Sequence, residues 1–309
     1  MDRGSASAAG RRVPRGLFGA LVAFLLLSPF PGLLVALPLA ALLLQARPGS
    51  LREWSWIGAT ALLVSISLAG GRDLARDLLL GYGVTFTAAV ILLSRFSPGP
   101  AFPRVAVAAV DSATLICVLV WALGLPWTEL RAAVDARWQA QLAEGLAFWR
   151  FSAGEAETLR RAVSALARVY PAIVVLGGIA GGMLARSLAW HITGGRIDPE
   201  PGRFRDFQFN DHLIWGAIVT LGLVLAPLAQ PWSLLALNLL VVWAGVYAAR
   251  GMAVAMTILA RWSLSLRLAL CISGALLLPY AAGALMLVGI ADTWLDLRRI
   301  QPPTQGVIS

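Results

Sequence analysis

Long apolar runs alternate with short polar connections along the whole chain. Runs of about 20 apolar residues are typical of membrane-spanning helices, because a helix of that length crosses the hydrocarbon core of a bilayer. The pattern predicts an all-α integral membrane helical bundle with eight or nine transmembrane helices, organised as a single polytopic domain over residues 1–309. The runs cover residues 17–45, 54–71, 78–94, 105–125, 165–188, 213–230, 234–260 and 268–290.

The first run leaves the number of spans open, because the sequence S-P-F-P-G interrupts it at residues 28–32. Proline lacks a backbone donor and disfavours helical geometry at the residue before it. Residues 17–45 therefore form either one kinked span or two short helices that meet at a turn. One crossing gives eight spans and two give nine, and the two alternatives place the C-terminus on opposite sides of the membrane.

The longest polar connection, residues 126–161, has a helical pattern of its own. Apolar side chains recur there at steps of four, which predicts an amphipathic helix. It lies either in the plane of the lipid headgroups or against its own bundle. Residues 1–16 form a basic tail and residues 300–309 a flexible one. The apolar positions of the connection are Leu130, Val134, Trp138, Leu142 and Leu146.

Composition supports the membrane assignment and narrows the partners. The chain is 59% hydrophobic and only 13% charged, whereas soluble domains carry about 25% charged residues. The net charge of +9 comes from arginine alone, since the sequence has no lysine. These arginines are spread along the connections, so we expect the lipid bilayer, and no nucleic acid, as their anionic partner. Their distribution favours a cytoplasmic N-terminus in a bacterial cytoplasmic (inner) membrane.

Two charged residues inside apolar runs are candidates for a polar cavity or a gate. A charge at the centre of a membrane costs about 2.5–3.5 kcal/mol on the insertion scale, so it needs a partner, a wet cavity or a route to the interface. Asp111 lies seven residues into its run, and Arg250 lies two-thirds along residues 234–260, beside Gly251. The two form a candidate ion pair. Alternatively, Asp111 is hydrated near an interface and Arg250 extends its head group to one.

The densest polar chemistry is the segment R-F-R-D-F-Q-F-N-D-H-L-I-W at residues 203–215, directly before an apolar run. It contributes Arg205 and Asp211 to the candidate cavity or gate. Asn238 in the next run completes the set, because an amide in lipid needs a hydrogen-bond partner and commonly bonds to another helix.

Four glycines in one run predict a helix-packing surface. Gly177, Gly178, Gly181 and Gly182 make two overlapping G-x-x-x-G pairs, which leave a flat strip on which a second helix can pack closely. The alternative is a pore or a ligand that approaches the backbone at this strip.

Patterns for metal binding or catalysis are missing from the sequence. His191, Asp211 and His212 lack the spacing of a zinc site. Asp292 and Asp296 with Arg299 suit a salt-bridge ladder at a helix end. Catalytic and nucleotide-binding motifs are missing too. We therefore expect no metal, no cofactor and no enzymatic activity.

Four segments carry a resemblance to a known family: L-P-L-A-A-L-L-L-Q-A-R-P-G (37–49), F-R-D-F-Q-F-N-D-H-L-I-W (204–215), N-L-L-V-V-W-A-G-V-Y-A-A-R-G (238–251) and D-T-W-L-D-L-R-R (292–299). They resemble the YybS-like membrane proteins, a resemblance that implies no activity. The first half also resembles the substrate-binding membrane subunits of energy-coupling-factor vitamin transporters.

The cost of placing the five candidate cavity residues at membrane depth favours a transporter-like or solute-binding protein. Its partner would be a small-molecule solute or another membrane or soluble subunit. The alternative is a membrane scaffold that docks a soluble or cell-envelope partner through residues 126–161 and 190–212.

Overall fold

The described part of the chain is helical throughout and falls into two compact units, residues 1–201 and 202–309. The computed structural model describes residues 32–69, 74–96, 99–149, 152–197, 202, 204–260 and 262–297, with four positions between residues 17 and 24. Most of both predicted tails, and the turn at residues 28–31, therefore lie outside the described residues.

A short helix, α2 (Leu33–Gln45), lies at the centre of unit 1. Eight of its thirteen side chains are buried, as expected for a helix that is apolar on every face. It begins after Gly32, whose backbone is left-handed with φ 72°, a conformation that favours glycine. The second half of the first apolar run is therefore a separate helix. Whether the run crosses the membrane once or twice depends on residues outside the described part.

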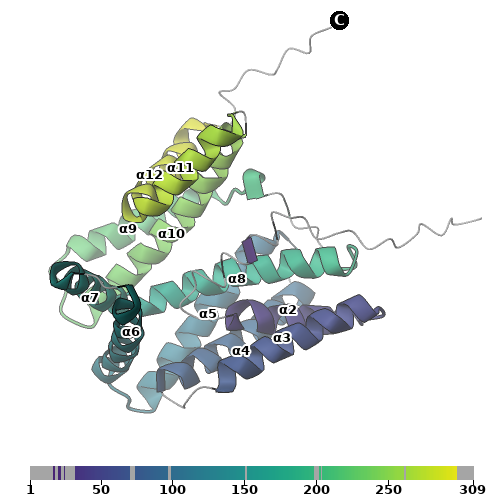
Figure 1. The fold of residues 1–309 in the computed structure, drawn as a ribbon, viewed down its shortest axis with the longest axis horizontal. Helices are drawn as coiled ribbons and strands as arrows, with labels where there is room; N and C mark the ends of the chain where they lie inside the picture. Colours follow the sequence, from purple (N-terminus) through teal and green to yellow (C-terminus); the bar gives the residue numbers. More distant parts are fainter. Residues whose placement is uncertain are drawn as a thin grey trace, which may run out of the picture. The chain divides into compact units, whose positions relative to one another are not determined.

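Four longer helices belong to the same unit: α3 (Leu51–Ala69), α4 (Leu74–Phe96), α5 (Ala101–Ala122) and α8 (Tyr170–Ile192). Helix α2 packs against α3, α4 and α8, and α5 packs against α4 and α8 (Figure 1). Apolar side chains from one face of α2 meet those of the last turns of α8 and form a core cluster of the unit. The cluster comprises Val35, Leu39, Leu42, Leu43, Ala185, Leu188, Ala189 and Ile192.

Glycines on α8 allow other elements to reach its backbone. A Cβ atom added at Gly181 would lie 2.6 Å from the carbonyl oxygen of Leu34 in α2, and one at Gly182 would lie 2.7 Å from the ring of Phe86 in α4. At Gly178 the hydroxyl of Tyr82 occupies the space of a side chain. Gly177 lies on the same helix and is half-buried. Larger side chains at the three contact positions would hold α2 and α4 away from α8.

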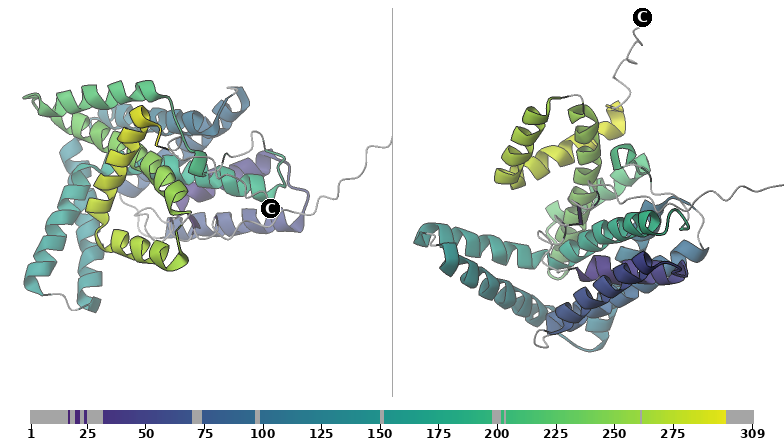
Figure 2. Two further views of the ribbon diagram at one scale, coloured as in Figure 1. Left: turned by 90° about the horizontal axis from the view of Figure 1, so that it is seen from above. Right: turned by 45° about the vertical axis from the view of Figure 1, so that its right-hand side comes forward.

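The predicted amphipathic helix over residues 126–161 is wrong in extent, because the segment forms a hairpin of two helices (Figure 2). Helix α6 covers Trp127–Trp149 and α7 covers Ala153–Arg168. The second helix begins at a capping box, in which Ser152 accepts from the N–H of Glu155 and Glu155 accepts from the N–H of Ser152. This reciprocal pairing satisfies donors that a helix start leaves open, so it fixes a new helix start within the connection.

The hairpin packs on its own unit, which was one of the two predicted alternatives. Leu130 and Val134 of α6 are buried with Ala75 of α4 and Ala167 of α7, and Trp138 packs against this group. The two arms of the hairpin are also joined by polar bonds: Gln139 of α6 donates to Ser164 of α7 at 3.1 Å, and Ser164 donates to Asp135 at 2.9 Å.

Unit 2 contains α9 (Ile214–Leu225), α10 (Trp232–Leu259), α11 (Leu264–Leu276) and α12 (Leu278–Leu295), preceded by two short 3-10 helices, η1 (Phe204–Asp206) and η2 (Asp211–Leu213). The most extensive packing is between α10 and α12, and α9 also packs on α10. The single span predicted for residues 268–290 is wrong, since the chain breaks at Leu277 into α11 and α12. Pro279, within the first two positions of α12, suits a new helix start.

Two glycines bring α10 and α12 into backbone contact. A Cβ atom at Gly251 would overlap the carbonyl oxygen of Leu285, and one at Gly289 would overlap that of Tyr247. Apolar helices in lipid gain little from burying one another, so close packing at small residues supplies much of their association. This crossing therefore determines the spacing of the two helices that carry the polar cluster described below.

Four described helices are long and apolar enough to cross a membrane: α4, α5, α8 and α10. Shorter apolar helices cover Leu33–Gln45, Asp211–Leu225, Leu264–Gly274 and Tyr280–Leu295.

The glycine contact in unit 2 can be tested by adding one methyl group at Gly289. Gly289→Ala should lower the free energy of unfolding in detergent micelles by about 1–3 kcal/mol, because overpacking forces the helices apart. Gly283→Ala on the same helix is the control, since nothing lies within 4 Å of its added Cβ. The control should be neutral or gain up to about 1 kcal/mol from helix propensity. Equal effects of both variants would contradict the close crossing.

Candidate functional site

A buried arginine with two carboxylate partners lies at the centre of unit 2. Arg250 on α10 is 3% exposed. Its Nε donates to the Asp292 carboxylate on α12 at 2.9 Å, its Nη1 to Asp211 at 2.7 Å, and its Nη2 to the backbone carbonyl of Asp292 at 3.1 Å. All three guanidinium nitrogens therefore donate, which compensates for the removal of the charge from water.

Aromatic rings cover this cluster on one side. The Phe209 ring centroid lies 5.3 Å from the Arg250 guanidinium carbon, within the range of a cation–π interaction. Phe209 also meets Tyr247 edge-on at 5.2 Å. The two acids differ in their surroundings: the Asp292 side chain is fully buried, whereas the Asp211 side chain is 61% exposed. The polar segment before α9 thus contributes one shielding ring and one solvent-facing acid.

The structure brings together two of the five predicted cavity residues, Asp211 and Arg250. Arg250 has two carboxylate partners within its own unit, Asp211 and Asp292, and Asp111 is exposed on α5 of unit 1. The ion pair between Asp111 and Arg250 therefore stays a prediction. Arg205 is exposed in η1. The Asn238 amide donates to the Leu234 carbonyl of its own helix at 2.9 Å.

The predicted ladder of Asp292, Asp296 and Arg299 is wrong. Asp292 lies in the last turn of α12, 2% exposed and turned toward Arg250. The helix ends at Leu295, and Asp296 has left-handed backbone geometry. Arg299 lies outside the described residues. Asp292 and Asp296 therefore do not continue one helical face.

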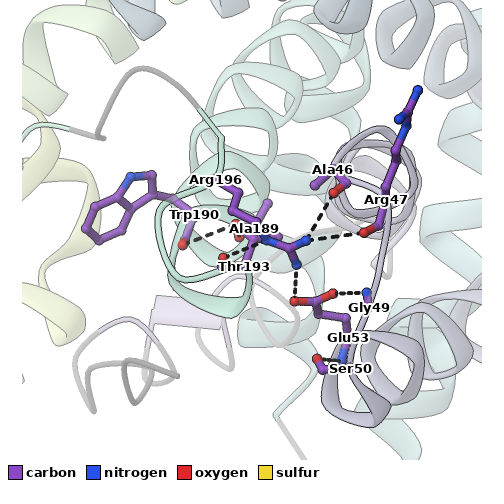
Figure 3. Close-up of polar contacts among 9 residues, drawn as sticks. All are labelled: Ala46, Arg47, Gly49, Ser50, Glu53, Ala189, Trp190, Thr193 and Arg196. Carbon is purple, nitrogen blue, oxygen red and sulfur yellow. Dashed lines mark hydrogen bonds and ion pairs between the residues drawn. The ribbon is translucent and has the colours of Figure 1, made fainter. Parts of the chain in front are cut away.

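A second polar cluster lies in unit 1, between the end of α8 and the connection from α2 to α3 (Figure 3). Arg196, just after α8, forms an ion pair with Glu53 in the first turn of α3. Its other donors reach the carbonyls of Ala46 at 3.3 Å and Arg47 at 3.2 Å in the α2–α3 connection. Glu53 in turn accepts from the Gly49 N–H at 2.8 Å. One guanidinium therefore ties the end of α8 to the connection between α2 and α3.

The charge on Glu53 is stabilised where it lies. Burial alone would raise the pKa of this carboxyl, but the hydrogen bonds from Arg196 and Gly49 and the charge of Arg196 outweigh it, and the pKa lies below its ordinary value. Glu53 therefore remains ionised at neutral pH and keeps the cluster together.

A third arginine is buried inside α8. Arg186 is 1% exposed, and its Nη1 donates to the Ser94 hydroxyl of α4 at 3.4 Å. Arg186 is therefore an exception to the expectation that the arginines lie along the connections.

A polar cleft of about 70 Å³ opens in unit 1 among α2, α3, α4, α6 and the start of α8. Arg76 and Arg137 contribute guanidinium groups to its lining, and Trp138 and Tyr170 contribute rings that meet edge-on at 5.9 Å. Arg76 is 7% exposed and donates to the carbonyl of Ser67 at the end of α3. The cleft is therefore cationic and aromatic in its walls.

An apolar hollow of about 50 Å³ adjoins the cleft and shares Leu79 and Tyr170 with it. Tyr82 lines this hollow; it is 2% exposed, and its hydroxyl has no hydrogen-bond partner in the described part of the chain. The remaining walls are apolar side chains of α4, α5, α6 and α8. They are Leu78, Ala113, Ile116, Cys117, Trp127, Leu130, Pro171 and Val174.

The three residues considered for a metal site each bond to different partners. His191 bonds through Nδ1 to the Ser187 carbonyl at 2.8 Å and meets Trp190 edge-on. Asp211 binds Arg250, and His212 donates its N–H to the Asn210 side chain in η2. Within the described ranges, no three His, Cys, Asp or Glu side chains gather closely enough to hold a metal.

Sequence reasoning missed the roles of Arg76, Tyr82, Glu53 and Arg196. Arg76 and Tyr82 lie one and a half turns apart near the start of α4, where an arginine at a helix end looks like an ordinary interfacial charge. Glu53 and Arg196 are 143 residues apart, so no local pattern links them. The capping box S-A-G-E at residues 152–155 was visible and would have predicted the second helix start.

The described part of the chain is helical, and four of its helices are long and apolar enough to cross a membrane, as expected of an all-helical membrane protein. The chain belongs to the family described as "Predicted membrane protein (DUF2232)", which matches residues 16–293 and thus parts of both units. No curated protein and no solved structure matches the chain.

The two acids around Arg250 should differ in their contribution to stability. Asp292→Asn should lower the free energy of unfolding by about 3 kcal/mol, because it leaves a buried guanidinium without its buried counter-charge. Asp211→Asn, the matched control, should lower it by about 1 kcal/mol or less, because water screens an exposed carboxylate. Unfolding titrations in detergent measure both. An Asp211→Asn loss as large as that of Asp292→Asn would contradict the assignment.

The Glu53 carboxylate should make stability depend on acid. Because its folded pKa is below the unfolded value, its contribution is complete above about pH 4.5 and is lost as the pH falls through the folded pKa. The melting temperature should be measured at neutral pH and at about pH 4. The drop between the two should be smaller in Glu53→Gln than in the unmodified protein. Glu157→Gln, at an exposed pair on α7, is the control; a smaller acid loss there as well would count against a specific role for Glu53.

Proposed function

We propose that the chain is a transporter-like, solute-binding membrane protein without enzymatic activity. The observation that carries this proposal is the cleft of unit 1. Concave sites with a few placed polar groups in an otherwise apolar wall are typical of small-molecule binding, and this cleft combines two guanidinium groups with an aromatic pair and an apolar extension. The resemblance of the first half to substrate-binding subunits of vitamin transporters supports the same function.

The membrane setting that we propose is the bacterial cytoplasmic membrane, with the N-terminus on the cytoplasmic side. Eight or nine crossings require more than the four long apolar helices, so the shorter apolar helices would have to cross in pairs or with local thinning of the bilayer. A 13-residue helix such as α2 is only about 20 Å long, less than the roughly 30 Å hydrocarbon core. The YybS-like resemblance suits this arrangement.

A second candidate is a scaffold that docks a soluble or cell-envelope partner. The hairpin α6–α7 favours it, because its arms are joined by polar bonds and it presents exposed charges such as Glu157, Arg160 and Arg161. Charge reversal at Arg161, far from the cleft lining, should abolish partner binding in a scaffold. It should leave retention of a solute unchanged in a solute-binding protein.

Native mass spectrometry of the full chain, released from detergent after mild purification, tests the solute-binding proposal. We expect a non-lipid small molecule to remain bound. Trp138→Ala should lose this molecule, because it removes one wall of the cleft, whereas Trp54→Ala, an exposed tryptophan on α3, should keep it. Spectra that show lipids alone, or a mass retained equally by both variants, would contradict the proposal.

A further inference from the structure

We propose that the cleft of unit 1 recognises a compact amphipathic anion: a ligand with one carboxylate or phosphate group joined to a small aromatic or branched apolar part. This inference rests on the proposed function and names its ligand class. It assigns Arg76 and Arg137 to the anionic group, and Trp138, Tyr170 and the adjoining hollow to the apolar part.

The charge of the lining carries the first half of the argument. Among the described residues that line the cleft are two arginines and no acidic side chain. A guanidinium presents planar donors that match a carboxylate or phosphate in a bidentate manner. Arg76 is mostly withdrawn from solvent, where the attraction between its charge and an anion is less screened than in water. The two arginines come from α4 and α6, so an anion between them would link the hairpin to the bundle.

The second half of the argument is the apolar hollow that adjoins the cleft. Its surface is almost wholly apolar, so a group that extends into it from the cleft must itself be apolar, because a polar group would lose its hydrogen bonds to water there. Tyr82 lines the hollow, and its hydroxyl lies against Gly178 rather than in the open space. Tyr82 is held by Gly178 on one side and by stacking on Phe86, with centroids 5.8 Å apart, on the other.

Size limits the ligand. A cavity of about 150 Å³ can enclose one benzene ring, and the cleft and the hollow, at about 70 and 50 Å³, are each smaller. A small branched group would therefore be enclosed, whereas an aromatic ring would lie partly outside the walls. Such an amphipathic anion has two sources: a soluble organic acid, or the head of an anionic lipid whose chains continue outside the cleft. Both share the chemistry that the lining selects.

Calorimetric titration of the full-length protein in neutral detergent, with benzoate, phenyl phosphate and isovalerate as probes, tests the charge requirement. At least one probe should bind at millimolar concentration or below, and benzamide, the uncharged counterpart of benzoate, should bind at least about tenfold more weakly. Failure of all three probes, or equal binding of benzoate and benzamide, would overturn the proposal.

Single substitutions test whether the probes bind in the cleft of unit 1. Arg137→Gln should weaken the best probe by at least about tenfold, and Arg137 is the first choice because it is exposed and its loss threatens folding least. Arg131→Gln, at an exposed position six residues earlier on α6 and outside the lining, is the matched control and should bind normally. Equal losses in Arg137→Gln and Arg131→Gln would overturn the assignment.

Reconstitution into lipid nanodiscs distinguishes a soluble organic acid from an anionic lipid as the ligand. It also distinguishes failure of the ligand class from failure of the solute-binding proposal. In nanodiscs of phosphatidylcholine alone, a soluble-acid site should bind the probes as in detergent. In nanodiscs that contain phosphatidylglycerol, a site for anionic lipid should bind the probes more weakly, because the lipid competes for it. This result would support the amphipathic-anion ligand class and contradict a soluble solute as the ligand. A neutral or cationic molecule displaced from the purified protein would contradict the ligand class and leave solute binding standing.

Discussion

Close backbone contact at glycine, next to a buried arginine, is the constraint on which unit 2 depends. Gly251 and Gly289 let α10 and α12 meet at their backbones, and this spacing brings the Arg250 guanidinium within bonding distance of both the side chain and the carbonyl of Asp292. Each feature needs the other. At a wider crossing the Arg250 guanidinium would lose its two acceptors on α12, and a buried charge without its buried counter-charge is strongly destabilising.

Unit 1 also has close packing at glycine and ion pairing of arginine, but at separate places. Glycines on α8 admit the backbone of α2 and the aromatic rings of α4, and the ion pair of Arg196 with Glu53 ties the end of α8 to the connection before α3. Arg186, inside α8, donates to a hydroxyl of α4. The cleft lies where α3, α4, α6 and the start of α8 meet, and Arg76 there is held by a carbonyl of α3. The arginines that line the cleft, Arg76 and Arg137, are therefore different from Arg186 and Arg196.

Periodicity and hydropathy predicted the helical membrane architecture because apolar run length reflects the thickness of a bilayer. They also singled out Arg250, because a charge inside an apolar run is costly. They did not identify the partners of Arg250. Asp292 was expected in a salt-bridge ladder at a helix end, and Asp211 was placed in the same candidate cavity but not paired with Arg250; only the fold brings residues 39 and 42 positions away from Arg250 to it. The break at Leu277 was hidden for a similar reason, since a proline inside an apolar run is compatible with either a kinked helix or two helices.

A double-variant cycle across α10 and α12 tests the central claim most directly. Arg250→Met and Asp292→Leu, measured singly and together by unfolding in detergent, should show that the double variant is more stable than either single variant, because removing both charges leaves no buried charge without a partner. We expect a coupling of at least about 1.5 kcal/mol between the two positions. Losses that simply add, within about 0.5 kcal/mol, would show that Arg250 and Asp292 do not depend on each other and would contradict the account.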